Sequence, residues 1–231
     1  EGKFKFGISN YAKFASPKKD KILAMNIKKH LKESDKSCRW VTGREKTLSS
    51  VIVEQNLMKN GIEIIIAGDY KKCLVARTLA VQPFKELSKR DYGRPGADDK
   101  SGMLPPKLAQ IMLNLADVKK DEILLDPFCG SGTVLAEASL MGVEKMIGTD
   151  ISAKAVSDTK KNLAWLKEKF NTGDLNVDIK KQDARNLAKI FSNNSIDKIV
   201  CEPFLGPQRG VVDQKKNKIE LDDLYSKSIK E

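Results

Sequence analysis

Residues 123–133 read Ile-Leu-Leu-Asp-Pro-Phe-Cys-Gly-Ser-Gly-Thr, and this stretch decides the fold. Its first three apolar residues are typical of the end of a buried strand, which the Asp-Pro pair closes. The two glycines then form a turn, and apolar residues return at helical spacing up to Met141. A strand, a glycine turn and a helix make the first unit of an open α/β sheet, whose ligands bind beyond the carboxyl ends of the strands.

Three further segments repeat the pattern of a strand followed by a polar turn. They end at Asp150, Asp183 and Glu202. Strands that alternate with helices predict a parallel sheet with right-handed crossovers. One acid at the end of a strand is ordinary. Four acids, Asp126 included, at the edge where such sheets bind ligands indicate a binding site.

The first 82 residues predict a smaller α+β domain. Its strands are expected at 3–8, 38–42, 62–67 and 73–81, and its helices at 20–31 and 47–58. This order of elements is similar to the later part of a THUMP domain, an RNA-binding module of tRNA-modifying enzymes. Residues 83–104 are rich in turn formers and charges, and we interpret them as a linker and functional loop before a second domain at 105–231.

The composition is that of a globular protein with an uneven charge. Hydrophobic residues make up 40% and charged residues 32% of the 231 residues, and the net charge is +11. Residues 1–99 hold 21 basic and 12 acidic residues. This excess favours a polyanion-binding half, although a lysine-rich solvated surface would give the same count.

Neither a membrane protein nor a metal protein is indicated. No apolar run reaches the roughly 18–20 residues of a membrane span, and lysines interrupt any signal-peptide core near the N-terminus. The four cysteines stand singly and the chain has one histidine, which argues against a structural zinc site and for a reducing compartment. We therefore expect a cytoplasmic protein without a bound metal.

The glycine turn excludes two classes of phosphate-bearing ligand. Position 135 is Leu, so the third glycine of the dinucleotide fingerprint is missing, and no Gly-Lys-Ser/Thr follows as in a phosphate loop. Asp150 lies where an acid holds the ribose hydroxyls of a nucleoside cofactor. The residues thus favour a ribose-bearing ligand without phosphates, and S-adenosylmethionine fits this description.

Two motifs resemble those of a known enzyme family. Residues 126–133 look like the cofactor loop of amino-methyltransferases, and residues 101–109, Ser-Gly-Met-Leu-Pro-Pro-Lys-Leu-Ala, look like the segment before that loop in THUMP-type tRNA guanine-N2 methyltransferases. The resemblance covers roughly residues 78–210. It implies a Rossmann-like methyltransferase domain that moves a methyl group from S-adenosylmethionine to an exocyclic base amine, with tRNA or another structured RNA as its partner.

The same resemblance implies the cofactor-binding residues. Gly130 and Gly132 would line the methionine portion of the cofactor, and Asp150 would bind its ribose hydroxyls. Asp183 would meet the adenine amine, while Asp126 would help to hold the ammonium group. Further cofactor contacts are implied for residues beside these motifs: Leu104, Pro105, Phe128, Ile151 and Ala184.

Catalysis is implied at residues 202–206, which read Glu-Pro-Phe-Leu-Gly. The family has Asp or Asn, two prolines and an aromatic residue there, so Glu202 is a longer acid and the aromatic residue comes one position early. An amine conjugated with its ring is a poor nucleophile. The Glu202 carboxylate and the Pro203 carbonyl would orient it and take up its proton. Phe204 would stack on a base that has left its own stack.

Three residues of the linker are candidates for substrate binding. Arg90, Tyr92 and Arg94 could grip RNA phosphates or stack on a base. The alternative is an interdomain salt-bridge cluster with the acids of the same segment: Asp91, Asp98 and Asp99.

The end of the chain and the exact activity leave alternatives open. Only 29 residues follow Glu202, whereas methyltransferases of this class continue with about three more strands. We therefore expect an incomplete sheet, from a truncated chain or one that a dimer or partner subunit completes. Two other functions stay open. One is a DNA adenine or cytosine amino-methyltransferase, and the other is a non-catalytic RNA-binding protein with a relic cofactor fold.

Overall fold

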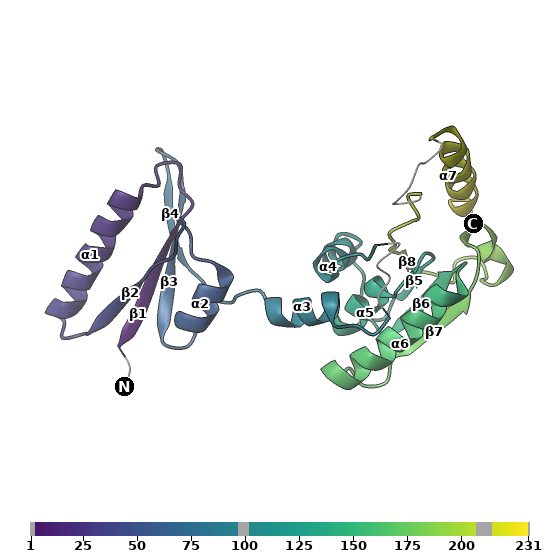
Figure 1. Ribbon diagram of the computed structural model, residues 1–231, viewed down its shortest axis with the longest axis horizontal. Helices are drawn as coiled ribbons and strands as arrows, with labels where there is room; N and C mark the ends of the chain where they lie inside the picture. The colour runs from purple at the N-terminus through teal and green to yellow at the C-terminus, as the bar shows by residue number, and fades with distance from the viewer. Residues whose placement is uncertain (1–2, 97–101, 207–213, 231) are drawn as a thin grey trace. The chain divides into compact units, whose positions relative to one another are not determined.

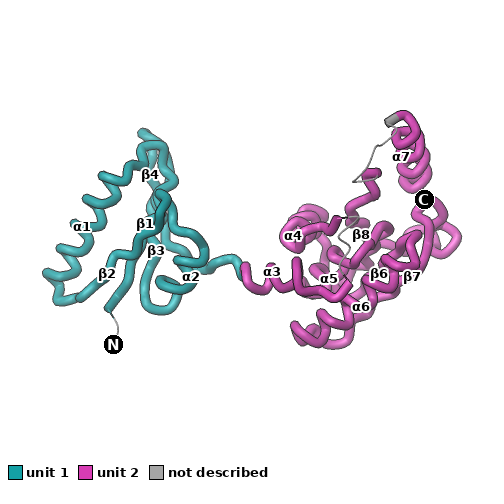
Figure 2. Tube along the Cα trace, in the orientation of Figure 1, with its two compact units in different colours: residues 1–83 teal, residues 84–231 magenta. Residues whose placement is uncertain are grey.

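The computed structural model describes residues 3–96, 102–206 and 214–230, and the chain divides into two compact units (Figure 2). Unit 1 comprises residues 1–83 and unit 2 comprises residues 84–231. Each unit contains a four-stranded sheet (Figure 1). Each unit also has its own buried apolar cluster, so each has the core of an independent fold.

The sheet of unit 1 has the strand order β2-β1-β3-β4. Strand β1 is parallel to β2 and to β3, and β4 is antiparallel to β3. The elements of unit 1 are, in chain order, β1 (Phe4–Asn10), α1 (Pro17–Glu33), β2 (Cys38–Val41), α2 (Ser50–Asn56), β3 (Gly61–Gly68) and β4 (Cys73–Arg77). Strands and helices thus follow one another in the order that the sequence predicts.

Successive residues of a strand point to opposite faces of the sheet, and both faces of the unit 1 sheet are covered by other elements. Phe6 and Ile8 of β1 lie in a buried cluster with Ala24 of α1. Gly7, between them, faces the other side, where a Cβ would lie only 2.8 Å from Cδ1 of Leu57, just after α2. Figure 1 shows α1 and α2 on opposite sides of this sheet.

The sheet of unit 2 is parallel throughout and has the strand order β7-β6-β5-β8. Its elements are α3 (Phe84–Tyr92), α4 (Pro106–Leu115), β5 (Ile123–Asp126), α5 (Thr133–Leu140), β6 (Lys145–Asp150), α6 (Ala153–Phe170), β7 (Asn176–Lys181), the 3₁₀ helix η1 (Ala184–Lys189), β8 (Lys198–Ile199) and α7 (Gln214–Ser228). The predicted α/β fold with a parallel sheet is therefore confirmed.

One buried cluster joins the helices of unit 2 to its sheet. It includes Leu113 of α4, Leu124 of β5, Leu135 of α5, Met146 of β6 and Leu163 of α6. Burial of apolar side chains of this size stabilises the folded state by about 1.5–3 kcal/mol each. The cluster holds β5, the strand that carries the glycine turn, in the interior of the sheet.

The interval 83–104, expected to be a linker and loop, instead begins with helix α3. Arg90 of α3 is buried, and its guanidinium donates hydrogen bonds of 2.6 and 3.1 Å to the two carboxylate oxygens of Glu137 on α5. Gln110 of α4 donates to the same carboxylate at 2.6 Å. Helix α3 is therefore fixed on the core of unit 2. The sequence of α3 is hydrophilic and its buried side chain is a charged one, so the sequence does not indicate that α3 packs against unit 2.

The buried pair of Arg90 and Glu137 predicts a large loss of stability when its acid is removed. Glu137→Ala would leave a buried guanidinium without a counter-charge, so the free energy of unfolding should fall by about 3–5 kcal/mol. Glu144→Ala is the matched control, since Glu144 pairs with Lys120 at 3.1 Å on the surface and should cost less than about 1 kcal/mol. Urea unfolding measures both, and equal small losses would contradict the prediction.

Candidate functional site

The four strand-end acids lie at one edge of the unit 2 sheet because its strands are parallel. Asp126 and Asp150 are the last residues of β5 and β6. Asp183 follows the end of β7 by two residues, and Glu202 follows the end of β8 by three. Asp150 and Glu202 both lie close enough to Asp126 to raise its pKa. Asp126 therefore interacts electrostatically with two other acids at this edge.

Asp126 is the most buried of these acids, with 2% of its surface exposed. Burial raises the pKa of Asp126 to about 8, and the charges of Asp150 and Glu202 act in the same direction. A hydrogen bond of 3.2 Å from the amide of Phe128 to its carboxylate opposes this change. Asp126 is therefore largely protonated at neutral pH, and a bound cation would favour its charged form.

The turn after β5 depends on its two glycines. Gly130 has φ +53° and Gly132 has φ +83°, a backbone conformation that other residues rarely adopt. A Cβ on Gly132 would also lie 2.8 Å from Cγ2 of Thr159. Asp150 joins this turn to the start of α6, because it accepts hydrogen bonds from the amide of Gly130 at 3.0 Å and from that of Ser152 at 2.8 Å.

Two polar side chains of α6 hold the turn in place, and no motif in the sequence predicts this role. The Thr159 hydroxyl donates to the carbonyl of Gly130 at 2.8 Å. The Asn162 amide donates to the carbonyl of Ser131 at 2.8 Å and exchanges hydrogen bonds of 2.7 and 3.0 Å with the backbone of Gly96. Their only sequence signal is that polar residues fall on the buried face of an amphipathic helix.

Arg90 and Arg94, candidates for RNA binding or for a salt-bridge cluster, are buried inside unit 2. The guanidinium of Arg90 is engaged by Glu137. Arg94 donates a hydrogen bond to the hydroxyl of Thr133, the first residue of α5. Burial lowers the pKa of Arg94, which reflects the cost of removing its charge from water. Both arginines therefore support the helix that follows the glycine turn.

Tyr92 and the acids near it differ from the two arginines. Tyr92 exposes 82% of its surface, so a ligand can reach its ring. Asp91 lies close enough to Arg94 to act on its pKa, against the larger effect of burial. Asp98 and Asp99, the other members of the alternative salt-bridge cluster, lie outside the described residues.

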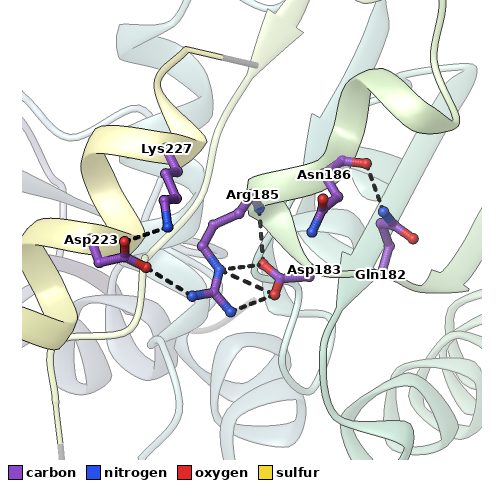
Figure 3. Close-up of polar contacts among 6 residues, drawn as sticks. All are labelled: Gln182, Asp183, Arg185, Asn186, Asp223 and Lys227. Atoms are coloured by element: carbon purple, nitrogen blue, oxygen red, sulfur yellow. Dashed lines mark hydrogen bonds and ion pairs between the residues drawn. The ribbon is translucent and has the colours of Figure 1, made fainter.

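Asp183 already has a full set of hydrogen-bond partners (Figure 3). Its carboxylate accepts bonds from the Arg185 amide at 2.9 Å, from Nε at 3.0 and 3.1 Å and from Nη2 at 2.6 Å. The side-chain bonds from Arg185 lower the pKa of Asp183. Nη1 of Arg185 also donates to Asp223 of α7 at 3.0 Å. An adenine amine could bind Asp183 only by replacing part of this pair.

The tip that follows β8 presents its chemical groups outward. Glu202 is exposed, and Phe204 exposes 51% of its surface. The carbonyl of Phe204 accepts a hydrogen bond from the hydroxyl of Tyr225 on α7. The remaining residues implied in cofactor binding differ in exposure: Leu104 and Ala184 are buried, Phe128 and Pro203 are half-buried, and Pro105 and Ile151 are exposed.

Within residues 3–96, 102–206 and 214–230, no three His, Cys, Asp or Glu side chains gather as a metal site would require. In the same part of the chain no helix is both long enough and apolar enough to cross a membrane.

Two protein-family models match the sequence. The model described as UPF0020, RMKL-like, methyltransferase domain, matches residues 96–231, which lie within unit 2. A second model, described as DNA methylase, matches residues 8–161, a range that takes in most of unit 1 and ends within α6. Both models belong to enzymes that methylate, and the first covers more than half of the chain and all four strand-end acids.

Curated relatives and solved structures are also similar to the chain. A tRNA (guanine(10)-N2)-dimethyltransferase of Methanothermobacter thermautotrophicus is 31% identical over 83% of this chain and 56% of its own length. A protein of the same name from Methanocaldococcus jannaschii is 40% identical over 57% of this chain and 34% of its own. The chain thus spans between a third and three fifths of these relatives. The crystal structure of TrmN from Thermus thermophilus shares the fold, with TM-score 0.57 and 20% identity over 100% of this chain and 57% of that one.

The buried carboxyl group of Asp126 predicts a specific pH dependence of stability. The folded chain keeps a proton on Asp126 that an unfolded chain loses above about pH 4, because the pKa rises to about 8 on folding. This residue therefore makes the free energy of unfolding fall as pH rises from about 4 to 8, by up to about 1.4 kcal/mol per pH unit. Asp126→Asn should remove this slope. Chemical denaturation at pH 5 and pH 8 measures it, and identical slopes in both proteins would refute the prediction.

Proposed function

Because the chain belongs to the RMKL-like methyltransferase domain family, we propose that it transfers a methyl group from S-adenosylmethionine to the N2 amine of a guanine in tRNA. The observation that carries this proposal is the cluster of Asp126, Asp150 and Glu202 around the glycine turn at the carboxyl edge of the sheet. The cofactor carries two positive groups, a sulfonium and an ammonium, and crowded carboxylates favour such a ligand.

The residues of the turn fit this cofactor. A Cβ added at Gly130 would meet nothing nearer than the Phe128 carbonyl at 3.9 Å, so the turn leaves open space beside it. Each carboxylate oxygen of Asp150 accepts one hydrogen bond from the backbone, which leaves one lone pair on each for the two ribose hydroxyls. Asp126, next to the turn, would hold the ammonium group and lose its proton to do so.

The adenine end requires a rearrangement. Asp183 is engaged by Arg185, and Asp223 is a second acid within 3.0 Å of the same guanidinium. Arg185 could therefore keep an ion pair with Asp223 while Asp183 turns one oxygen towards the adenine amine. Asp183 and Arg185 are half-buried, so this exchange would cost more than the loss of an exposed ion pair, which contributes only about 0–1 kcal/mol.

In the methyl transfer, the residues of this chain orient the acceptor and take up its proton. The bound cofactor supplies an electrophilic methyl group on sulfur. The Glu202 carboxylate and the Pro203 carbonyl would each accept a hydrogen bond from one N–H group of the guanine amine. The amine nitrogen would then point at the methyl group. As the new C–N bond forms, the bond between sulfur and the methyl group would break with its electron pair left on sulfur as a neutral thioether, and Glu202 would accept the proton released by the amine. Phe204 is exposed and can stack on the flipped base, and the longer side chain of Glu requires a deeper pocket than Asp would.

Two observations support RNA as the substrate. The curated relatives described above are named for tRNA guanine methylation. Residues 1–99 carry nine more basic than acidic residues, and a basic module attracts a phosphate backbone. We propose that unit 1 is a THUMP-like RNA-binding domain and that the enzyme acts in the cytoplasm, where its separate cysteines stay reduced. The exposed edge at β8 could accept a strand of a partner or a second copy.

A DNA amino-methyltransferase is the second candidate, because the DNA methylase model matches residues 8–161. The test is to give the chain labelled S-adenosylmethionine with either unmodified tRNA or duplex DNA. The proposal expects label in N2-methylguanosine after the tRNA is digested to nucleosides. Label only in DNA would support the second candidate. Two results would support a non-catalytic RNA-binding protein. One is cofactor binding without transfer of label to tRNA or to DNA, and the other is the absence of cofactor binding in calorimetry.

Substitutions of Glu202 and Asp150 are predicted to affect methyl transfer and cofactor binding separately. Glu202→Ala should lower the rate of methyl transfer by at least about 100-fold and leave the Kd for S-adenosylmethionine within twofold, because Glu202 acts on the acceptor. Asp150→Ala should do the reverse and weaken cofactor binding first. Glu144→Ala, at the opposite end of β6, is the control. Calorimetry and single-turnover kinetics measure both quantities, and equal loss of binding and rate in Glu202→Ala would show that its role is wrongly assigned.

A further inference from the structure

Helix α7 contacts two segments of the site, η1 after β7 and the tip after β8. Strands β7 and β8 are the outer strands of the unit 2 sheet. Arg185, in η1 after β7, donates a hydrogen bond to Asp223 of α7 at 3.0 Å. Phe204, after β8, accepts one from Tyr225, two residues further along the same helix. A single helix turn therefore contacts the segments that follow both outer strands, at the carboxyl edge of the sheet.

The contact at the β7 side is an ionic chain. Asp183, Arg185, Asp223 and Lys227 follow one another in the order acid, base, acid, base, as Figure 3 shows. The side-chain bonds from Lys227 and Arg185 lower the pKa of Asp223, so this acid stays charged and keeps its hold on η1. This end of α7 is thus fixed to the acid expected to meet adenine.

The contact at the β8 side fixes the backbone of the catalytic tip. The hydroxyl of Tyr225 donates to the carbonyl of Phe204, and burial raises the pKa of Tyr225, so the hydroxyl keeps its proton. Nearby, a Cβ on Gly206 would lie 2.7 Å from the side-chain amide of Asn217 on α7, in a conformation with φ +100°. The helix and the tip therefore approach closely at a second point.

We propose that α7 is a strap across the cofactor edge and that Tyr225 is a positioning residue for methyl transfer. Tyr225 holds the Phe204 carbonyl, and thereby sets the direction of the Phe204 ring and of the Glu202 carboxylate two residues before it. Its hydroxyl donates to a backbone carbonyl and not to the reacting atoms, so it moves no proton in the reaction. The inference rests on the proposed function, since it assigns a role within the same site.

Without the hydrogen bond from Tyr225 to the Phe204 carbonyl, the protein would still bind the cofactor but would orient the acceptor amine less accurately. Small displacements of reacting groups lower rates strongly. Removal of the Tyr225 hydroxyl should therefore lower kcat and leave cofactor affinity alone. A merely structural role for α7 would instead change stability or both kinetic quantities together.

The test compares Tyr225→Phe with Ser226→Ala, which removes a hydroxyl from the next residue of the same helix. In Tyr225→Phe we expect kcat for tRNA to fall about five- to tenfold, the loss of one hydrogen bond, with the Kd for S-adenosylmethionine unchanged within twofold. Ser226→Ala should match the original protein in both. An unchanged kcat in Tyr225→Phe, or a Kd that rises as much as kcat falls, would overturn the inference.

A second measurement is independent of activity. Backbone ¹⁵N relaxation of the free chain reports the mobility of the Phe204 and Leu205 amides, with order parameters of about 0.85 for rigid and below about 0.6 for flexible backbone. We expect these to fall in Tyr225→Phe and to stay unchanged in Ser226→Ala. Unchanged values in both variants would overturn the role of Tyr225 even if methyl transfer occurs. Conversely, absence of methyl transfer by the original protein would refute the proposed function and leave this measurement valid.

Discussion

The proximity of three carboxyl groups at one sheet edge is the interaction on which the rest of this structure depends. Burial raises the pKa of Asp126 to about 8, and the charges of Asp150 and Glu202 act in the same direction, so Asp126 holds a proton at neutral pH. Such an arrangement is unfavourable by itself and becomes favourable when a cationic ligand lies among the acids. The sulfonium and ammonium groups of S-adenosylmethionine match that requirement, while a phosphate-bearing ligand would be repelled.

The architecture around the acids serves to hold this edge in one conformation. Thr159 and Asn162 of α6 fix the carbonyls of the glycine turn, and Asp150 fixes its amide. Arg90 and Glu137 join α3 to α5, the helix that begins at the end of the turn. Helix α7 is tied to η1 and to the tip after β8. Each support is a polar contact that removes freedom from a backbone segment which must approach a ligand.

Much of the fold could be predicted from the sequence, because strand periodicity and the two glycines leave few alternatives. The parallel sheet and the position of its acids followed from the strand ends alone. The role of Arg90 could not be predicted, since a basic residue in a hydrophilic segment gives no sign of its buried partner 47 residues away. The same holds for Asp183: its place at the edge was predictable, but its saturation by Arg185 depends on side-chain conformation and on α7, which the local sequence does not encode.

The central claim is most directly tested by a crystal structure of the chain with S-adenosylmethionine. The account predicts that the ribose hydroxyls bind the carboxylate of Asp150, that the amino-acid end lies beside Gly130 and Asp126, and that Glu202 faces the sulfur from across the pocket. A nucleoside bound away from the turn, or a turn without ligand at saturating concentration, would contradict it.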